Sequence, residues 1–134
     1  MTRSSYAWKT EIRYMTDILL AGKSKERQRV ACWACVSPGS WHSGIGVNRR
    51  LVFPGRGEQE RGIRFTLHAE EDALRRLCFG GWVGCFFVLR LTPGGRIALA
   101  RPCDSCMRML LRAGAREIYW TTNNGTVEGG KTGL

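Results

Sequence analysis

The sequence predicts one α/β domain over residues 1–134, with a mixed sheet of four to five strands and helices packed on its faces. Three observations support this fold class. Helix-like and strand-like segments alternate along the second half of the chain, after an initial helix and hairpin. The length suits a single core, and no linker or internal repeat interrupts the chain. The longest apolar run, residues 30–36, is far shorter than the roughly 18 residues of a membrane-spanning helix.

The first half of the chain predicts a helix and then a β-hairpin. Large apolar side chains recur at helical spacing within residues 5–21: Trp8, Ile12, Met15 and Leu19. Residues 29–36 are apolar after Arg29, which indicates a strand buried on both faces. The turn at residues 37–40 leads into a second expected strand at residues 41–48.

The second half begins with residues 49–64, which show no hydrophobic period and contain Pro54, three glycines and five arginines. We expect a long loop there. Thr66 is expected to cap a helix that runs to about Leu77. The remaining expected elements follow in order: a strand at 83–91, an extended segment at 96–100, a helix at 103–113, a strand at 116–122, and one short strand after the turn at 123–125.

The charge of the chain favours anionic partners. The net charge is +10, and 17 of the 21 basic residues are arginine, so the surface attracts nucleotides, nucleic acid or acidic membrane faces. The first 13 residues carry charges where a signal peptide has its apolar stretch. We therefore expect a cytoplasmic protein with no membrane partner.

Two short segments contain the residues that indicate chemistry. Cys103 and Cys106 open one predicted helix and are three residues apart, so they share one face of it. His68 lies in the first turn of the other predicted helix. Two thiolates and one imidazole form a three-ligand zinc site of the catalytic kind, which leaves the fourth position to water. Glu70 follows His68 by two residues, and its carboxylate beside that water would carry protons.

Other cysteines and the second histidine have plainer interpretations. Cys32 and Cys35 also form a C-x-x-C pair, but residues i and i+3 of a strand face opposite sides of the sheet, so both cannot bind one metal. We expect Cys32, Cys35, Cys78 and Cys85 to be buried as small apolar residues. His42 either lines the pocket or is structural. A structural zinc site is the alternative for the His68 cluster, but it usually has four protein ligands, and no fourth is clearly placed.

The segments His68-Ala69-Glu70 and Pro102-Cys103-Asp104-Ser105-Cys106 match an H-x-E…P-C-x-x-C signature. In this the chain resembles the zinc-dependent cytidine and deoxycytidylate deaminase superfamily, over about residues 28–122. The resemblance implies a three-layer α-β-α cytidine-deaminase-like fold, a homo-oligomer, and hydrolytic conversion of cytosine to uracil with release of ammonia. It also implies roles in substrate binding: Asn48 beside the sugar and base, the Ala69 N–H on the base carbonyl, and the Pro102 carbonyl on the exocyclic amine.

The substrate class rests on two clues that disagree. Family members that act on free cytidine usually have a glutamate two residues after the asparagine, where this chain has Arg50, directly after Arg49. Arginine suits phosphate, and Arg50 has the strand parity of Asn48, which makes it the better candidate of the two. However, the short stretch after Gly125 leaves no room for the further helix that nucleotide-acting and nucleic-acid-acting members often carry.

We expect a phosphate-bearing cytidine or deoxycytidine nucleotide as substrate. Single-stranded DNA or RNA is the second hypothesis, because the net charge of +10 and five tryptophans suit backbone contacts and base stacking. Free cytidine, and a non-catalytic zinc-containing binding module, are the remaining alternatives.

Overall fold

The computed structural model describes residues 8–22, 29–35, 43–53, 63–76 and 84–133. Their central element is a mixed sheet with the strand order β2-β1-β5-β7-β8. Its strands are β1 (Arg29–Cys35), β2 (Ser43–Val47), β5 (Cys85–Leu91), β7 (Glu117–Thr121) and β8 (Val127–Lys131), and the short β6 (Ile97–Ala98) pairs with β5. β5 and β7 run parallel, and the other neighbours are antiparallel.

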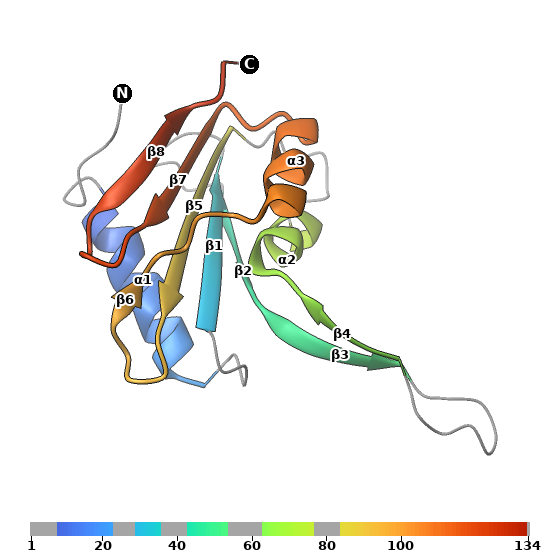
Figure 1. Cartoon of the computed structure of the whole chain (residues 1–134), viewed down its shortest axis with the longest axis vertical. Helices are drawn as coiled ribbons and strands as arrows, with labels where there is room; N and C mark the ends of the chain where they lie inside the picture. Colours follow the sequence, from blue (N-terminus) through green and yellow to red (C-terminus); the bar gives the residue numbers. More distant parts are fainter. Residues whose placement is uncertain (1–7, 23–28, 36–42, 54–62, 77–83, 134) are drawn as a thin grey trace.

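Helices cover both faces of this sheet, so the predicted three-layer α-β-α arrangement is confirmed (Figure 1). The helices are α1 (Lys9–Leu20), α2 (Ala69–Arg76) and α3 (Asp104–Arg112). α1 lies on one face, and α2 and α3 lie on the other. Strand β5 alternates between the two layers, because Phe87 packs in the cluster beneath α1 while Phe86 and Val88 pack beneath α2 and α3.

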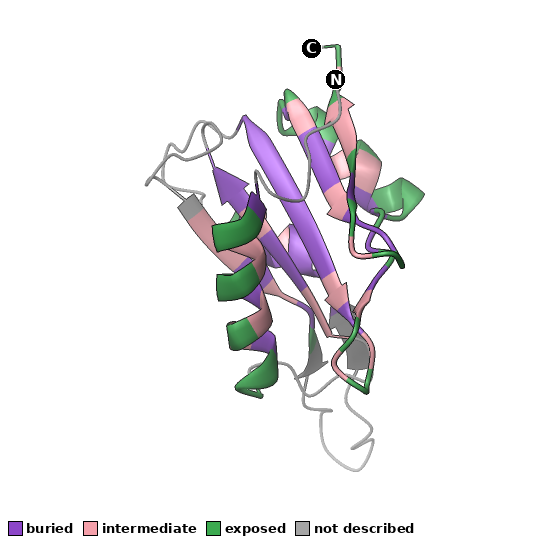
Figure 2. Ribbon diagram, turned by 90° about the vertical axis from the view of Figure 1, so that its left-hand side faces the viewer, coloured by how far each residue is buried: buried purple, intermediate pink, exposed green. Residues whose placement is uncertain are grey.

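Helix α1 buries the stripe that the sequence predicted. Met15 and Leu19 are fully buried, and Trp8, just before the helix, stacks on Phe87 with 4.5 Å between ring centroids. The opposite side of the helix is exposed (Figure 2). This layer closes the face of the sheet that lies away from His68 and the two cysteines.

The stretch expected to be a long loop is a second, two-stranded sheet. β3 (Arg49–Phe53) pairs antiparallel with β4 (Ile63–Leu67), and the ribbon of this hairpin extends away from the main sheet (Figure 1). The register pairs Leu51 with Phe65 and Phe53 with Ile63. The proline and glycines that suggested a loop all lie between the two strands, at residues 54–62.

The start of α2 also differs from the prediction. The helix begins at Ala69, and Thr66 belongs to β4 instead of capping the helix. Pairing with β3 keeps the chain extended up to Leu67. The His68 carbonyl accepts the Asp72 N–H at 3.0 Å, so His68 takes the position just before the first helical turn.

Helix α2 lies directly on strand β2 at Gly46. A Cβ atom at this glycine would overlap the backbone of Ala69 and Ala73. Only glycine permits this close approach, and it sets the helix that carries Glu70 against the strand that leads to Asn48. No helix within the described ranges has the length and apolar character needed to cross a membrane.

Candidate metal centre and active site

Three side chains converge where the N-terminal ends of α2 and α3 meet. His68 precedes α2, Cys103 is the N-cap residue of α3, and Cys106 lies in the first turn of α3. One ligand atom from each residue lies within 4.8 Å of the other two. His68 Nδ1 is 3.1 Å from Cys106 Sγ and 3.8 Å from Cys103 Sγ.

These distances fit a zinc ion. Zinc bonds of about 2.0–2.1 Å to nitrogen and 2.3 Å to sulfur, in tetrahedral geometry, place ligand atoms about 3.6 Å apart. Across the described residues, the group contains these three ligands and no fourth. A set of two thiolates and one imidazole is therefore compatible with a zinc ion that keeps one position open.

Glu70 lies beside this cluster in a mostly buried position, with 5% of its surface exposed. Burial raises the pKa of the Glu70 carboxyl above its usual value. Burial also raises the pKa of the Cys106 thiol, and the nearby Glu70 carboxylate raises it further. The Glu70 carboxyl and the Cys106 thiol thus lie in the same buried site. A divalent cation bound there would stabilise the charged forms of both groups.

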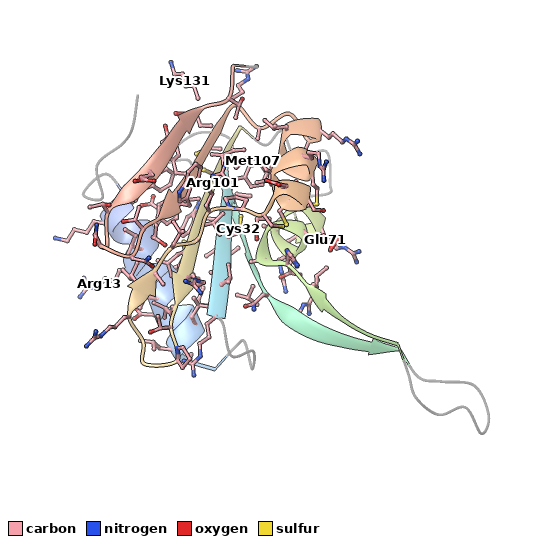
Figure 3. The ribbon with its side chains drawn as sticks, viewed as in Figure 1. Arg13, Cys32, Glu71, Arg101, Met107 and Lys131 are labelled. Carbon is pink, nitrogen blue, oxygen red and sulfur yellow. The ribbon has the colours of Figure 1, made fainter. Side chains whose placement is uncertain are left out.

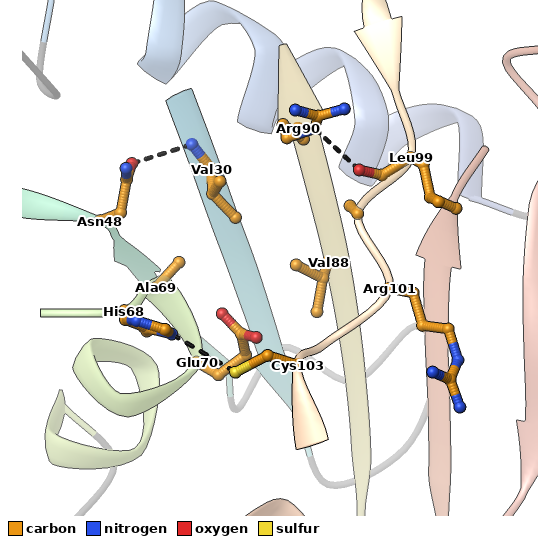
Figure 4. A pocket seen from close by; sticks show the side chains of 11 residues that line it. Val30, Asn48, His68, Ala69, Glu70, Val88, Arg90, Leu99, Arg101 and Cys103 are labelled. Atoms are coloured by element: carbon orange, nitrogen blue, oxygen red, sulfur yellow. Dashed lines mark hydrogen bonds between the residues drawn. The ribbon is translucent and has the colours of Figure 1, made fainter. Parts of the chain in front are cut away.

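A pocket of about 300 Å³ opens over the cluster (Figure 4). This volume is at the small end of the range for small-molecule sites. Its lining combines apolar walls with a few polar groups: Val30, Asn48, His68, Ala69, Glu70, Val88, Arg90, Leu99, Ala100, Arg101 and Cys103. The predicted residues Asn48, His68, Ala69, Glu70 and Cys103 therefore meet in one cavity.

Asn48 is held in place from the side of β1. Its Oδ1 accepts the Val30 N–H at 2.9 Å, and its own N–H donates to the Val30 carbonyl at 3.1 Å. Asn48 lies between β2 and β3 and is 7% exposed. The structure places Asn48 directly after β2, where it lines the pocket, and its contact with a substrate stays a prediction.

The parity argument for Arg50 does not hold. β2 ends at Val47, and β3 begins a different sheet at Arg49, so Asn48 and Arg50 are not alternate residues of one strand. In the β3–β4 ladder Arg50 is opposite Thr66, and its side chain is outside the described residues. A contact between Arg50 and a substrate phosphate stays a prediction.

The interpretation of the second C-x-x-C pair is confirmed. Cys32 packs in the cluster beneath α2 and α3, whereas Cys35 packs in the cluster beneath α1. Figure 3 shows Cys32 between the sheet and these two helices. Cys85 is buried as expected, while Cys78 and His42 lie outside the described residues.

Pro102 is buried directly before Cys103, and the contact of its carbonyl with the exocyclic amine stays a prediction.

Sequence reasoning missed Asp72, a buried carboxylate that joins α2 to the Asn48 segment. Its Oδ2 accepts the Val47 N–H at 3.0 Å, and its Oδ1 binds Arg49 Nη2 at 2.8 Å. Arg76 Nε donates to Oδ2 at 3.1 Å. Both neighbours of Asn48 are thus tied to the helix that carries Glu70. The only sequence signal was an acidic run directly after the H-A-E motif.

Replacing Asp72 with alanine is expected to destabilise the fold by about 2–3 kcal/mol, because the half-buried Val47 N–H and two guanidinium groups lose their acceptor. Urea unfolding checks this value. The matched control is Glu71→Gln: Glu71 is 39% exposed, lies 3.9 Å from Arg75, and is expected to contribute under about 1 kcal/mol. Equal stability of the two variants would contradict the role of Asp72.

Two arginines that line the pocket were also missed. Arg90 lies on β5, where it is the one charged residue of an otherwise apolar strand. Arg101 precedes Pro102 and places its guanidinium 5.7 Å from the centre of the Trp120 ring. A charged residue inside a strand of large apolar side chains was the signal that would have identified Arg90.

The structure is similar to solved cytidine deaminases. The cytidine deaminase from Mycobacterium leprae matches with a TM-score of 0.58 and 19% sequence identity, covering 91% of this chain and 92% of that chain. The cytidine deaminase from Mycobacterium tuberculosis matches with a TM-score of 0.56 and 21% identity, covering 89% and 87%. No protein-family model and no curated protein matches the sequence. The chain therefore has the fold of cytidine deaminases.

Proposed function

We propose that the protein is a zinc-dependent hydrolytic deaminase that converts the cytosine of a phosphate-bearing cytidine or deoxycytidine nucleotide to uracil and releases ammonia. One observation carries this proposal: a His68–Cys103–Cys106 cluster and the buried Glu70 carboxylate meet in one pocket of about 300 Å³. The similarity of the fold to solved cytidine deaminases supports it.

His68, Cys103 and Cys106 would hold the zinc ion, which when bound supplies a water molecule acidified to a pKa near 7. A Glu70 oxygen accepts the proton of the attacking water and passes it to the ring nitrogen beside the attacked carbon. The hydroxyl group now on that carbon then gives its proton to the Glu70 carboxylate, which passes it to the leaving amine, so that the C–N bond breaks and ammonia departs as the carbonyl forms. Burial raises the pKa of the Glu70 carboxyl above its usual value, which helps this group to take up a proton before it returns it.

The substrate contacts follow from positions around the pocket. Asn48 presents its carboxamide to the sugar and base from a place fixed by Val30. Ala69 lines the pocket between the proposed ligand His68 and Glu70, so its N–H suits the base carbonyl. The Pro102 carbonyl suits the exocyclic amine. A donor for the carbonyl oxygen together with an acceptor for the amine selects cytosine over adenine.

Ammonia release across cytidine, dCMP, dCTP and a cytosine-containing oligonucleotide tests the substrate class. We expect dCMP or CMP to be turned over with the highest kcat/KM, and its KM to respond weakly to salt between roughly 50 and 200 mM. An oligonucleotide that touches several phosphates would instead lose affinity steeply over the same range. Zinc retention without ammonia release from any of these compounds would contradict the proposal and indicate a binding module.

The homo-oligomer implied by the family resemblance stays a prediction, as do the single-domain organisation and the cytoplasmic location. Light scattering of the zinc-loaded chain measures the oligomeric state directly.

A further inference from the structure

We propose that Arg90 forms a phosphate subsite at the outer end of the pocket and selects a 5′-mononucleotide over the free nucleoside. This inference rests on the proposed function, because it assumes that the cytosine ring lies at the metal cluster. It assigns phosphate recognition to a β5 residue, not to the arginines that follow Asn48.

The first support is the position of Arg90 in the sheet. Arg90 pairs with Val30 across the β1–β5 ladder, and the Val30 N–H binds the Asn48 side chain. Asn48, Val30 and Arg90 therefore form one row across the sheet. The neighbouring row contains Cys32 opposite Val88, and both pack in one cluster with Ala69, the residue between His68 and Glu70. The rows are two residues apart, or about 7 Å along each strand.

The row that contains Arg90 is therefore farther from the His68–Cys103–Cys106 cluster than the row of Cys32 and Val88. The separation of the two rows is about the length of a sugar ring. Figure 4 shows Asn48 and Arg90 at one end of the pocket, and His68, Glu70 and Cys103 at the other. Arg90 shares its face of β5 with Phe86 and Val88, both of which pack on the side of α2 and α3. A base at the metal cluster with its sugar beside Asn48 would direct a 5′-phosphate toward Arg90.

The second support is how the Arg90 guanidinium is held. Its Nε donates to the Leu99 carbonyl at 2.7 Å, which fixes the plane of the group. Within the part of the chain that the structure describes, no carboxylate pairs with Arg90. The two Nη atoms thus keep donors for a ligand, and the planar fork of a guanidinium matches two oxygens of a phosphate.

The other arginines near the pocket are engaged differently. The Arg49 guanidinium binds the buried carboxylate of Asp72 at 2.8 Å. Arg101 directs its guanidinium toward Trp120 and away from the centre of the pocket (Figure 4). Arg50 lies in the β3–β4 hairpin, beyond the break in strand pairing at Asn48.

The test compares deoxycytidine with dCMP for the zinc-loaded wild type, Arg90→Gln and Arg90→Lys. We expect Arg90→Gln to lower the ratio of kcat/KM for dCMP over deoxycytidine by about 10- to 100-fold, with little change on deoxycytidine itself. Arg90→Lys should recover part of the ratio, because an ammonium keeps the charge but not the fork. The matched control is Arg96→Gln, an exposed arginine in the turn before β6, which should leave the ratio unchanged.

Equilibrium binding of dUMP and deoxyuridine gives a second readout that needs no turnover, and Arg90→Gln should raise the ratio of the dUMP Kd to the deoxyuridine Kd by the same factor. The subsite would be overturned if Arg90→Gln lowered kcat/KM equally for both substrates or left their ratio unchanged. It would also be overturned if Arg50→Gln, and not Arg90→Gln, lowered the ratio. If the wild type released no ammonia from any cytosine compound, the proposed deaminase function would fail. The two Kd values would still decide whether Arg90 binds phosphate.

Discussion

Replacing Glu70 with glutamine is expected to lower kcat by at least about 100-fold while zinc content and folding are retained. A positioned proton carrier contributes about 10²–10⁴-fold to a rate, and glutamine keeps the shape of the side chain but cannot take up the proton. Glu70 is not among the three clustered ligand residues, so zinc should stay bound. The free energy of unfolding should be unchanged or slightly higher, because a neutral amide costs less to bury than a carboxylate.

The control for this prediction is the adjacent carboxylate. Glu71→Gln removes the same charge from the same helix, but Glu71 lies on the outer side of α2 (Figure 3), and it should keep wild-type turnover. Ammonia release at saturating substrate, together with metal analysis of both variants, separates chemistry from folding. A Glu70→Gln variant within a few-fold of wild-type kcat would contradict the proton-carrier role.

Part of the His68–Cys103–Cys106 cluster was predictable from sequence because the spacing of its two cysteines is local. Cys103 and Cys106 are three residues apart, as the N-cap residue and a first-turn residue of α3, so the start of one helix brings them together. The burial of Cys32 and Cys35 on opposite faces was predictable for the same reason, since alternation is fixed within a single strand. The position of His68 beside the cysteines requires the starts of α2 and α3 to meet. That prediction depended on the H-x-E…P-C-x-x-C pattern.

Contacts between segments that are distant in the sequence could not be predicted from local residue spacing. Asp72 is important because β2 passes across α2 at Gly46 and brings the Val47 N–H to its carboxylate. Nothing in the acidic run after His68 distinguishes Asp72 from the more exposed Glu71. Similarly, Arg90 reaches the pocket only because β1 and β5 pair with Val30 opposite Arg90.

The β3–β4 hairpin was missed for a different reason. Pro54 and the glycines between the strands dominated the composition of a 16-residue window, although Leu51, Val52 and Phe53 form a short apolar run before them. Pairing between residues 49–53 and 63–67 stabilises both segments as strands, and this pairing cannot be recognised from either segment alone. The parity argument for Arg50 has a separate fault, because it extended the second strand past Asn48, where the structure begins a new strand.

Replacing Cys103 with alanine is expected to remove most of the zinc and, with it, detectable deamination. The three-ligand set becomes a two-ligand set, which cannot hold zinc in competition with a mild chelator. Cys103 is exposed, so the substitution removes little packing, and any fall in thermal stability should reflect loss of the metal. Metal analysis after gel filtration measures the zinc content, with about one ion per chain expected for the wild type.

The matched control for this substitution is Cys32→Ala, which removes a thiol from the other C-x-x-C pair. Cys32 is fully buried near Glu70 and Cys106 but does not belong to the cluster of ligand atoms. Its loss should lower stability modestly, by about 1 kcal/mol for a small cavity, while zinc stays bound. Zinc retained in Cys103→Ala but lost in Cys32→Ala would move the metal to the strand cysteines and overturn the assignment of His68, Cys103 and Cys106.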